Sequence, residues 1–333
     1  MKKIKFWFQN ARPVALPQSF MPAVVAFFLA LRQPGFCWWL GILAIFGGCM
    51  AHLGMNLADD YFDYRKKETG FRDSLAREGI RARTTKCPYI TSGEATVKQT
   101  LLAAVTFGIL ALIPGAVIFA FRGWVIAVIV LIAVVLGESY SGEPLRLSYR
   151  GLGEPDIGVM FGPLLMLGVY YASCGHFSWD LAAPAVSMGL LVTNILYVHS
   201  VLDYEADRRA GKATLAALVR GRIGRMEVLA VFLFLPYGIT ALLAALGRIS
   251  PWYLLVFVTF GWAVKLFTSM DTYTKHPEKP VTFRGWYGPM ANWQMICEGK
   301  LDWFMFRWYL ARNLLTAFAM VYIVVSVGLA LAG

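Results

Sequence analysis

Long apolar runs recur along this chain and leave little room for a soluble core. A membrane hydrocarbon core about 30 Å thick is crossed by a helix of about 20 apolar residues. Nine such segments can be read, near 14–33, 37–57, 99–120, 124–141, 157–175, 181–201, 227–246, 251–269 and 309–331. Of the 333 residues, 58% are hydrophobic and only 15% are charged, too few polar residues to cover a soluble domain. The sequence therefore predicts an all-α polytopic membrane protein, with about nine transmembrane helices in a bundle around a central cavity.

The segments between the apolar runs contain no Ser/Gly-rich linker or low-complexity stretch that would separate domains. We therefore expect residues 1–333 to form a single domain. The five cysteines show no CxxC spacing and lie mostly in or beside apolar runs. They are interpreted as small hydrophobic side chains rather than as metal ligands or disulfides.

The distribution of basic residues predicts the orientation of the chain. With a cytoplasmic N-terminus, the cytoplasmic segments would be 1–13, 58–98, 142–156, 202–226 and 265–312, which contain 28 of the 31 Lys and Arg residues. Such a bias is the rule for cytoplasmic loops. Basic loops facing anionic lipid and an anionic substrate then explain the net charge of +11 without nucleic acid. No cleavage site follows the basic N-terminus, so we expect an integral protein of a bacterial inner membrane.

Carboxylates gather at the predicted cytoplasmic end of the second span. Asn56, Asp59 or Asp60, and Asp63 recur at steps of three and four residues. A helix with 3.6 residues per turn places such residues on one face. We expect this face to form one half of a polar site, with Asn56 contacting the substrate.

A matching pair ends the sixth span. Asp203 and Asp207 have the same helical spacing, and Asn194 and His199 precede them towards the bilayer. We expect Asn194 and His199 to line the substrate pocket, although a buried histidine satisfied by a neighbouring side chain is the more common role of a residue such as His199. A four-helix unit repeated in parallel would place the two clusters at the same membrane face.

Carboxylates at one membrane face repel each other unless a divalent cation neutralises them. Oxygen ligands at this density suit Mg²⁺, which bridges carboxylates to the phosphates of a substrate. The expected metal ligands are Asp59, Asp63, Asp203 and Asp207. Nearby basic residues would hold the remaining phosphate charge, namely Arg65, Lys66, Lys86, Arg208 and Lys212. A hydrophobic bundle below such a site implies a diphosphate with a long lipid tail.

The alternative interpretation is that the aspartates are interfacial, solvated groups paired with neighbouring Lys or Arg. Two pairs in matching positions, each followed by basic residues, favour the metal site. A short loop with several Gly and Pro residues precedes the fifth span and would permit a tight turn over that site. Its Arg146 and Tyr149 are further candidates for contact with the diphosphate.

These segments resemble the UbiA superfamily of intramembrane aromatic prenyltransferases. Asp59-Asp60-Tyr-Phe-Asp63 and Asp203-Tyr-Glu-Ala-Asp207 look like its two aspartate-rich motifs. Arg12-Pro13 with Pro17, and the stretch 207–215, are similar to its 1,4-dihydroxy-2-naphthoate branch. The resemblance covers most of the chain.

What the resemblance implies is a nine-helix bundle, dependence on Mg²⁺, and transfer of a polyprenyl chain from its diphosphate to an aromatic acceptor. The catalytic residues would be Asp59, Asp60, Asp63, Asp203 and Asp207, with the active site facing the cytoplasm. No obligatory protein partner is implied.

Two departures from the family pattern concern the site. Asp59 stands where the family usually has Asn, which adds a negative charge beside the metal. Residues 199–202 read His-Ser-Val-Leu where the naphthoate branch commonly has Asn-Asn-x-Arg, and this change falls on the expected acceptor pocket. The resemblance to that branch implies 1,4-dihydroxy-2-naphthoate, in menaquinone synthesis, as the first acceptor. The alternative acceptors are 4-hydroxybenzoate, homogentisate, a tetrapyrrole or a glycerol phosphate lipid.

A function from another class is transport of divalent cations. A transporter would place its carboxylates near the bilayer midplane on broken helices. In this sequence the carboxylates cluster at one membrane face among basic residues that suit phosphate. That placement favours a prenyltransferase over a cation transporter.

Overall fold

The computed structural model describes residues 2–65, 87–209 and 211–332. The predicted phosphate-binding residues Lys66 and Lys86 therefore lie outside the described residues. Within these ranges, eight helical spans are long and apolar enough to cross a membrane, and Pro17–Ala30 is a shorter apolar helix. The predicted all-α membrane architecture is confirmed, and the shorter helix occupies the place of the first predicted span.

Four of these helices come from the first part of the chain. They are α2 (Pro17–Ala30), α3 (Trp38–Arg65), α6 (Val97–Arg122) and α7 (Trp124–Ser141). The fifth span combines α8 (Gly153–Val159), a π-helical turn η3 (Met160–Leu164) and α9 (Leu165–Cys174). The remaining spans are η4–α10 (Trp179–Leu181 and Ala182–Leu202), α13 (Gly221–Ala245), η5–α14 (Pro251–Thr259 and Phe260–Lys275) and α16 (Asp302–Ala332).

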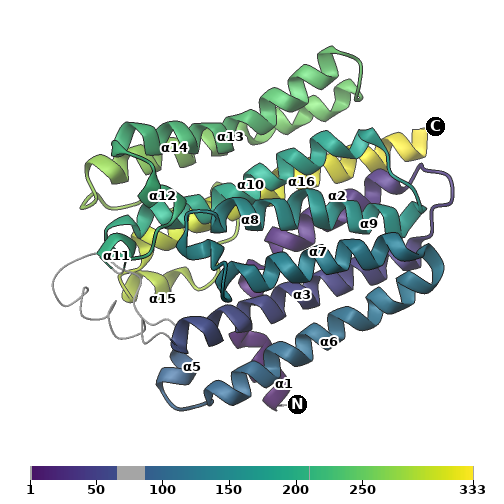
Figure 1. The fold of residues 1–333 in the computed structure, drawn as a ribbon. Coiled ribbons are helices and arrows are strands. Elements are labelled where there is room, and N and C mark those ends of the chain that lie inside the picture. Colours follow the sequence, from purple (N-terminus) through teal and green to yellow (C-terminus); the bar gives the residue numbers. More distant parts are fainter. Residues whose placement is uncertain (1, 66–86, 210, 333) are drawn as a thin grey trace.

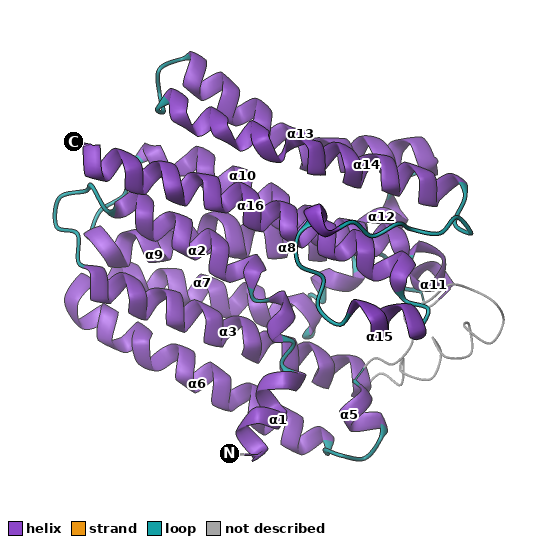
Figure 2. Ribbon diagram, turned by 180° about the vertical axis from the view of Figure 1, so that it is seen from behind, coloured by secondary structure: helices purple, strands orange, loops and turns teal. Residues whose placement is uncertain are grey.

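Both aspartate-bearing helices, α3 and α10, end at the same end of the bundle (Figure 1). We call this the polar end. Short helices gather there, as Figure 2 shows from behind. They are α1 (Lys2–Asn10), α5 (Pro88–Thr91), α11 (Tyr204–Arg209), α12 (Leu215–Leu218) and α15 (Trp293–Glu298). Two 3₁₀ turns, η1 (Pro13–Ala15) and η2 (Leu147–Tyr149), connect longer helices, and a third, η6 (Gly285–Tyr287), precedes α15.

Helix α2 lies inside the bundle and packs mainly against α16 and α9. It has fourteen residues, so it rises about 21 Å. Proline stands in its first turn, and a second proline, Pro22, lies within it. Because α2 begins only at Pro17, the residues before it pack beside the C-terminal part of α3. A small apolar cluster that includes Ala11, Leu57 and Tyr89 holds this region together.

The crossing of α8 and η3 with α10 is the closest helix contact near the site. A Cβ atom added to Gly158 would lie 1.9 Å from Thr193 Oγ1, and one added to Gly162 would lie 2.4 Å from the Cα of Gly189. Small residues permit such approach between membrane helices. Pro163 lies in the π-helical turn at this crossing, a common cause of such irregular turns. The crossing fixes α8 against α10, the most buried span.

This packing predicts the effect of adding one methyl group. The Gly162→Ala variant should be less stable than the wild type by about 1–3 kcal/mol, because its Cβ would meet the α10 backbone. Gly261 in α14 is the matched control, since a Cβ there meets nothing within 4 Å. Replacing Gly by Ala raises helix propensity equally in both variants. The difference between their unfolding midpoints in detergent therefore measures the cost of the clash at Gly162. Equal midpoints would show that the crossing tolerates a methyl group.

Candidate active site

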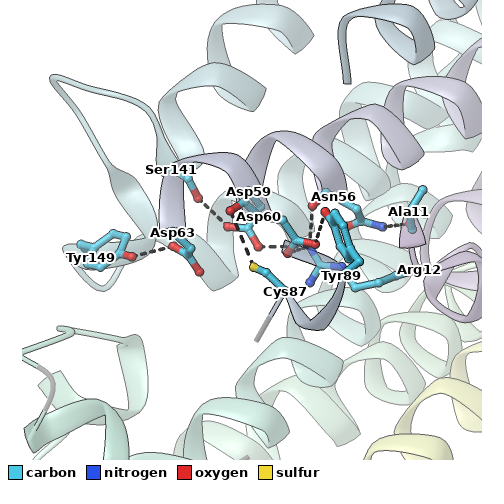
Figure 3. A network of polar contacts seen from close by, with 10 residues as sticks. All are labelled: Ala11, Arg12, Asn56, Asp59, Asp60, Asp63, Cys87, Tyr89, Ser141 and Tyr149. Atoms are coloured by element: carbon cyan, nitrogen blue, oxygen red, sulfur yellow. Dashed lines mark hydrogen bonds and ion pairs between the residues drawn. The ribbon is translucent and has the colours of Figure 1, made fainter. Parts of the chain in front are cut away.

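Arg12 links the segment before α2 to the end of α3 (Figure 3). Its Nη2 donates to the carbonyl oxygen of Asn56 at 2.7 Å and to Asp59 Oδ2 at 3.2 Å. The same nitrogen lies 3.2 Å from Asp60 Oδ1. In return, Asn56 Nδ2 donates to the carbonyl oxygen of Ala11 at 2.9 Å. One guanidinium therefore offsets part of the negative charge of two adjacent aspartates.

The three aspartates of α3 have different partners. Ser141 Oγ at the end of α7 donates to Asp59 Oδ1 at 2.7 Å. The hydroxyl of Tyr149, from η2, donates to Asp63 Oδ1 at 2.6 Å, and that of Tyr89, from α5, donates to Asp60 Oδ2 at 3.0 Å. Asp60 thus faces α5, whereas Asp63 faces the loop between α7 and α8 (Figure 3). The helical spacing predicted their common end of α3 but not these separate directions.

Two pKa shifts outside the spans follow from this arrangement. Burial and the charge of Asp60 raise the pKa of Tyr89 well above its ordinary value, so its hydroxyl stays protonated and donates. Burial alone would lower the pKa of Arg12, but Asp60 and Asp59 together leave that pKa above its ordinary value. Arg12 therefore remains a cation.

The second pair of aspartates lies where α10 gives way to α11. The amide of Asp203 donates to the carbonyl of His199 at 2.9 Å, and that of Asp207 to the carbonyl of Asp203 at 2.8 Å. His199 Nε2 lies 3.1 Å from Oδ2 of Asp203, whose side chain is fully buried. His199 therefore has a neighbouring side chain as its partner, as in the alternative interpretation of this residue. It also lines the cavity described next.

One cavity of about 240 Å³ brings the two aspartate clusters together. We call it the polar cavity. Asn56 and Asp59 line it from α3, and Asp207 and Lys212 line it from α11 and the residue stretch that follows. Its other walls come from helices far apart in the sequence, through Gln18, His52, Tyr140, Ser148, Glu154, Phe161, His199, Ser200, Phe304, Met305 and Trp308, among others.

Two cations contact the ring of Tyr149. The guanidinium carbon of Arg146 lies 4.6 Å from the ring centroid and Lys212 Nζ lies 5.2 Å from it. Arg146 has a left-handed backbone conformation, with φ of 49°. Its Nε and Nη2 are buried and have no hydrogen-bond partner within the described ranges of the chain, so they are donors to which an anion could bind. The residues predicted from the loop, Arg146 and Tyr149, thus lie beside Asp63 and the wall of the polar cavity.

Other predicted phosphate ligands point elsewhere. Arg65 donates to the hydroxyl of Tyr61 at 3.0 Å and is exposed. Arg208 and Arg209 pair with Glu205 at 3.4 and 2.9 Å. The hydrogen bond from Arg209 lowers the pKa of Glu205.

Asn194 was predicted to line the substrate pocket, but it is not among the residues that line the polar cavity. Five residues separate it from His199, so the two side chains point about 140° apart around α10. Asn194 is fully buried, and in the described part of the chain neither polar atom of its side chain has a hydrogen-bond partner. It lies in the packed interior of α10 rather than beside His199, because the two residues are not separated by a whole number of helical turns.

A second, apolar cavity of about 470 Å³ runs between α3, α6, α7 and α9. We call it the apolar groove. It is lined largely by Gly, Ala and aliphatic residues, among them Gly108 and Gly115. Met55 and Phe161 line both the groove and the polar cavity. The two spaces therefore adjoin, with these two side chains between them.

Several residues of the site were absent from the sequence prediction. Arg12 carried a signal, since Arg12-Pro13 opens the first apolar run. Ser141 and Glu154 lie in loop segments that resemble the naphthoate branch, but nothing in the sequence indicated their partners or those of Tyr89, because these contacts join segments 82, 46 and 29 residues apart. Such pairings depend on helix packing and not on local spacing.

The chain belongs to the UbiA prenyltransferase family, whose model matches residues 19–290. The 2-carboxy-1,4-naphthoquinone phytyltransferase of Synechocystis is 28% identical over 281 residues, covering 83% of this chain and 85% of the relative. The 1,4-dihydroxy-2-naphthoate octaprenyltransferase of Mycobacterium tuberculosis is 30% identical, covering 72% and 82%. A solved UbiA homolog from Archaeoglobus fulgidus bound to GPP and Mg²⁺ has a similar fold, with a TM-score of 0.59 at 15% identity, covering 96% and 99%. The family predicted from the motifs is confirmed, and the protein is a prenyltransferase.

The Arg12 contacts can be tested by a double-mutant cycle. The Arg12→Gln variant should lose about 1–3 kcal/mol of stability, a value discounted from that of a buried pair because the Arg12 side chain is 36% exposed. Adding Asp60→Asn should recover part of the loss, since it removes the carboxylate left uncompensated. Unfolding midpoints of the four proteins give the coupling. Strictly additive effects would mean that Arg12 and Asp60 do not interact.

Proposed function

We propose that this prenyltransferase uses Mg²⁺ to transfer a polyprenyl chain from its diphosphate to an aromatic ring, with 1,4-dihydroxy-2-naphthoate as the first acceptor. The observation that carries the proposal is that Asp59 and Asp207, one from each motif, line a single cavity. That cavity adjoins an apolar groove suited to an isoprenoid tail. The catalytic role is assigned to Asp59, Asp60, Asp63, Asp203 and Asp207.

The carboxylates suit Mg²⁺ that binds together with a diphosphate. Among the residues that the structure describes, no three His, Cys, Asp or Glu side chains form a ready metal-binding group. Mg²⁺ usually needs only one or two carboxylates, with phosphate oxygens and water as its other ligands. Asp59 and Asp207 in the cavity, with Asp63 and Asp203 beside them, would hold it. Bound there, it would stabilise the charge that develops on the departing pyrophosphate.

The protein's own side chains then have distinct tasks. Lys212 and the unpartnered nitrogens of Arg146 would donate to the diphosphate. The apolar walls would exclude water, which would otherwise quench an allylic cation. Phe161, Phe304 and Trp308 line the cavity, and an aromatic ring face can stabilise such a cation.

The named activities of the two bacterial relatives support a naphthoate acceptor. His199 and Ser200, which replace two Asn residues of that branch, line the polar cavity. 4-Hydroxybenzoate, homogentisate, a tetrapyrrole or a glycerol phosphate lipid are the alternative acceptors at the same site. We place the polar end at the cytoplasmic face of a bacterial inner membrane, because the basic residues are biased to its loops.

The aspartates can be tested by pyrophosphate release. Asp207→Ala and Asp63→Ala should each lower Mg²⁺-dependent release from a polyprenyl diphosphate by at least about 10²-fold, because charge on the leaving group is no longer stabilised. Asp180→Ala is the control, since Asp180 is exposed in η4 at the opposite end of the bundle. Release is measured on purified protein in detergent. Wild-type turnover in both site variants would remove these residues from the mechanism.

The apolar groove gives a test that depends on chain length. A Cβ on Gly108 meets nothing within 4 Å, so Gly108→Phe should fill the groove without disturbing the packing. The KM for a long polyprenyl diphosphate should rise about tenfold, while that for dimethylallyl diphosphate stays unchanged. Gly261→Phe in α14, equally uncrowded, is the control. If long and short donors respond alike, the tail lies elsewhere and bilayer lipid fills the groove.

A further inference from the structure

One buried carboxylate of the polar cavity has only neutral partners. Glu154 is 4% exposed. Its Oε1 accepts a hydrogen bond of 2.5 Å from Ser200 Oγ, and the amide of Leu215 lies 3.1 and 3.3 Å from its two oxygens. Among the described residues it forms no ion pair, in contrast to Asp59, which contacts Arg12. A buried charge without a cationic partner is costly, and such groups are concentrated at functional sites.

Helix packing places this carboxylate in the cavity wall. Glu154 is the second residue of α8, and the glycine contacts between the fifth span and α10 bring it to Ser200. A Cβ on Gly153 would lie 2.7 Å from the Cα of Ser148. The absence of that side chain lets η2 approach the start of α8. Glu154 and Ser148 therefore lie on the same side of the cavity.

Ser148 supplies an independent observation. Its side chain is 5% exposed, and its buried hydroxyl has no hydrogen-bond partner among the residues that the structure describes. Buried hydroxyls are nearly always hydrogen-bonded, because an unsatisfied one loses the interaction that water provided. Ser148 lines the same cavity as Glu154. A hydroxyl or carbonyl oxygen of a bound molecule would satisfy it.

We propose that Ser148 and Glu154 form a subsite for a hydroxyl group of the aromatic acceptor, and that Glu154 accepts the proton of that hydroxyl as the ring attacks. This inference rests on the proposed prenyl transfer. The acceptor is thereby restricted to phenol- or quinol-type rings. Ser200 and the Leu215 amide act as positioning groups, because they hold the carboxylate through hydrogen bonds.

The step balances without a further reagent. The bond between the prenyl carbon and the diphosphate oxygen breaks, and pyrophosphate departs with the electron pair. A π pair of the ring forms the new carbon–carbon bond while the hydroxyl proton moves to Glu154, leaving a dienone. The alkylated ring carbon then loses a proton to the released pyrophosphate or, where it bears a carboxylate, loses carbon dioxide. The electron pair of that bond restores the aromatic ring, and Glu154 returns its proton to the ring oxygen.

The test separates proton transfer from binding. With 1,4-dihydroxy-2-naphthoate and geranylgeranyl diphosphate, Glu154→Gln should lower prenylation at saturating acceptor by about 10²–10⁴-fold, because the amide cannot accept the proton. The affinity for the diphosphate should stay unchanged. Acetate should restore part of the activity of Glu154→Ala, where it can occupy the vacated space, but not that of Glu154→Gln. A Glu154→Gln enzyme with wild-type turnover would overturn the proposal.

A second measurement requires no substitution in the protein. The mono-O-methyl ethers of 1,4-dihydroxy-2-naphthoate lack one transferable proton each. The wild-type enzyme should prenylate one of the two ethers about 10²-fold more slowly than the parent acceptor. Full rates with both ethers would overturn the subsite. If the wild type releases no pyrophosphate with any acceptor, the proposed function itself fails. If the wild type prenylates the acceptor but neither the Glu154 substitutions nor the O-methyl ethers lower the rate, only the role of Glu154 fails.

Discussion

The polar end depends on how five carboxylates are held together at the edge of an apolar bundle. Their mutual repulsion has to be offset locally, since the surroundings offer little water to screen it. Arg12 offsets part of it at Asp59 and Asp60, while Tyr149, Tyr89 and Ser141 supply neutral donors to the same helix end. Each of these groups comes from a different segment. The positions of η1, α5, α7 and η2 around α3 are therefore tied to the same charges that we assign to catalysis.

The site consists of two adjoining cavities with different linings. The polar cavity carries the charged and hydroxylated side chains, and the apolar groove carries small and aliphatic ones. A prenyl diphosphate has the same division between headgroup and tail. Met55 and Phe161, which line both spaces, lie where the reacting carbon would be. Under the proposed function, the polar cavity would recognise the charge of the donor and the apolar groove would recognise the length of its chain.

The positions of the spans and of the aspartate motifs could be predicted from the local spacing of residues. Runs of apolar residues predicted the spans, and the four-residue steps of Asp203 and Asp207 predicted their helical register, because both depend only on neighbours in the chain. The first span was predicted at 14–33, and the structure has the shorter α2 at Pro17–Ala30 in that place, because the α-helix begins only at a proline. The partners of Asp60 and Glu154 lie on distant segments, which only tertiary packing brings near. The single domain of residues 1–333 stays a prediction.

The length of α2 has a consequence for access from water. A rise of about 21 Å falls short of the roughly 30 Å of hydrocarbon, and α2 lies inside the bundle rather than at its rim. The 3₁₀ turn η1 directly precedes α2, with Leu16 in a helical conformation between them, and continues the helical path towards the polar end. Under the proposed function, a diphosphate headgroup would reach Asp59, whose side chain is 23% exposed, from the aqueous phase, while its hydrocarbon tail would stay in the lipid phase.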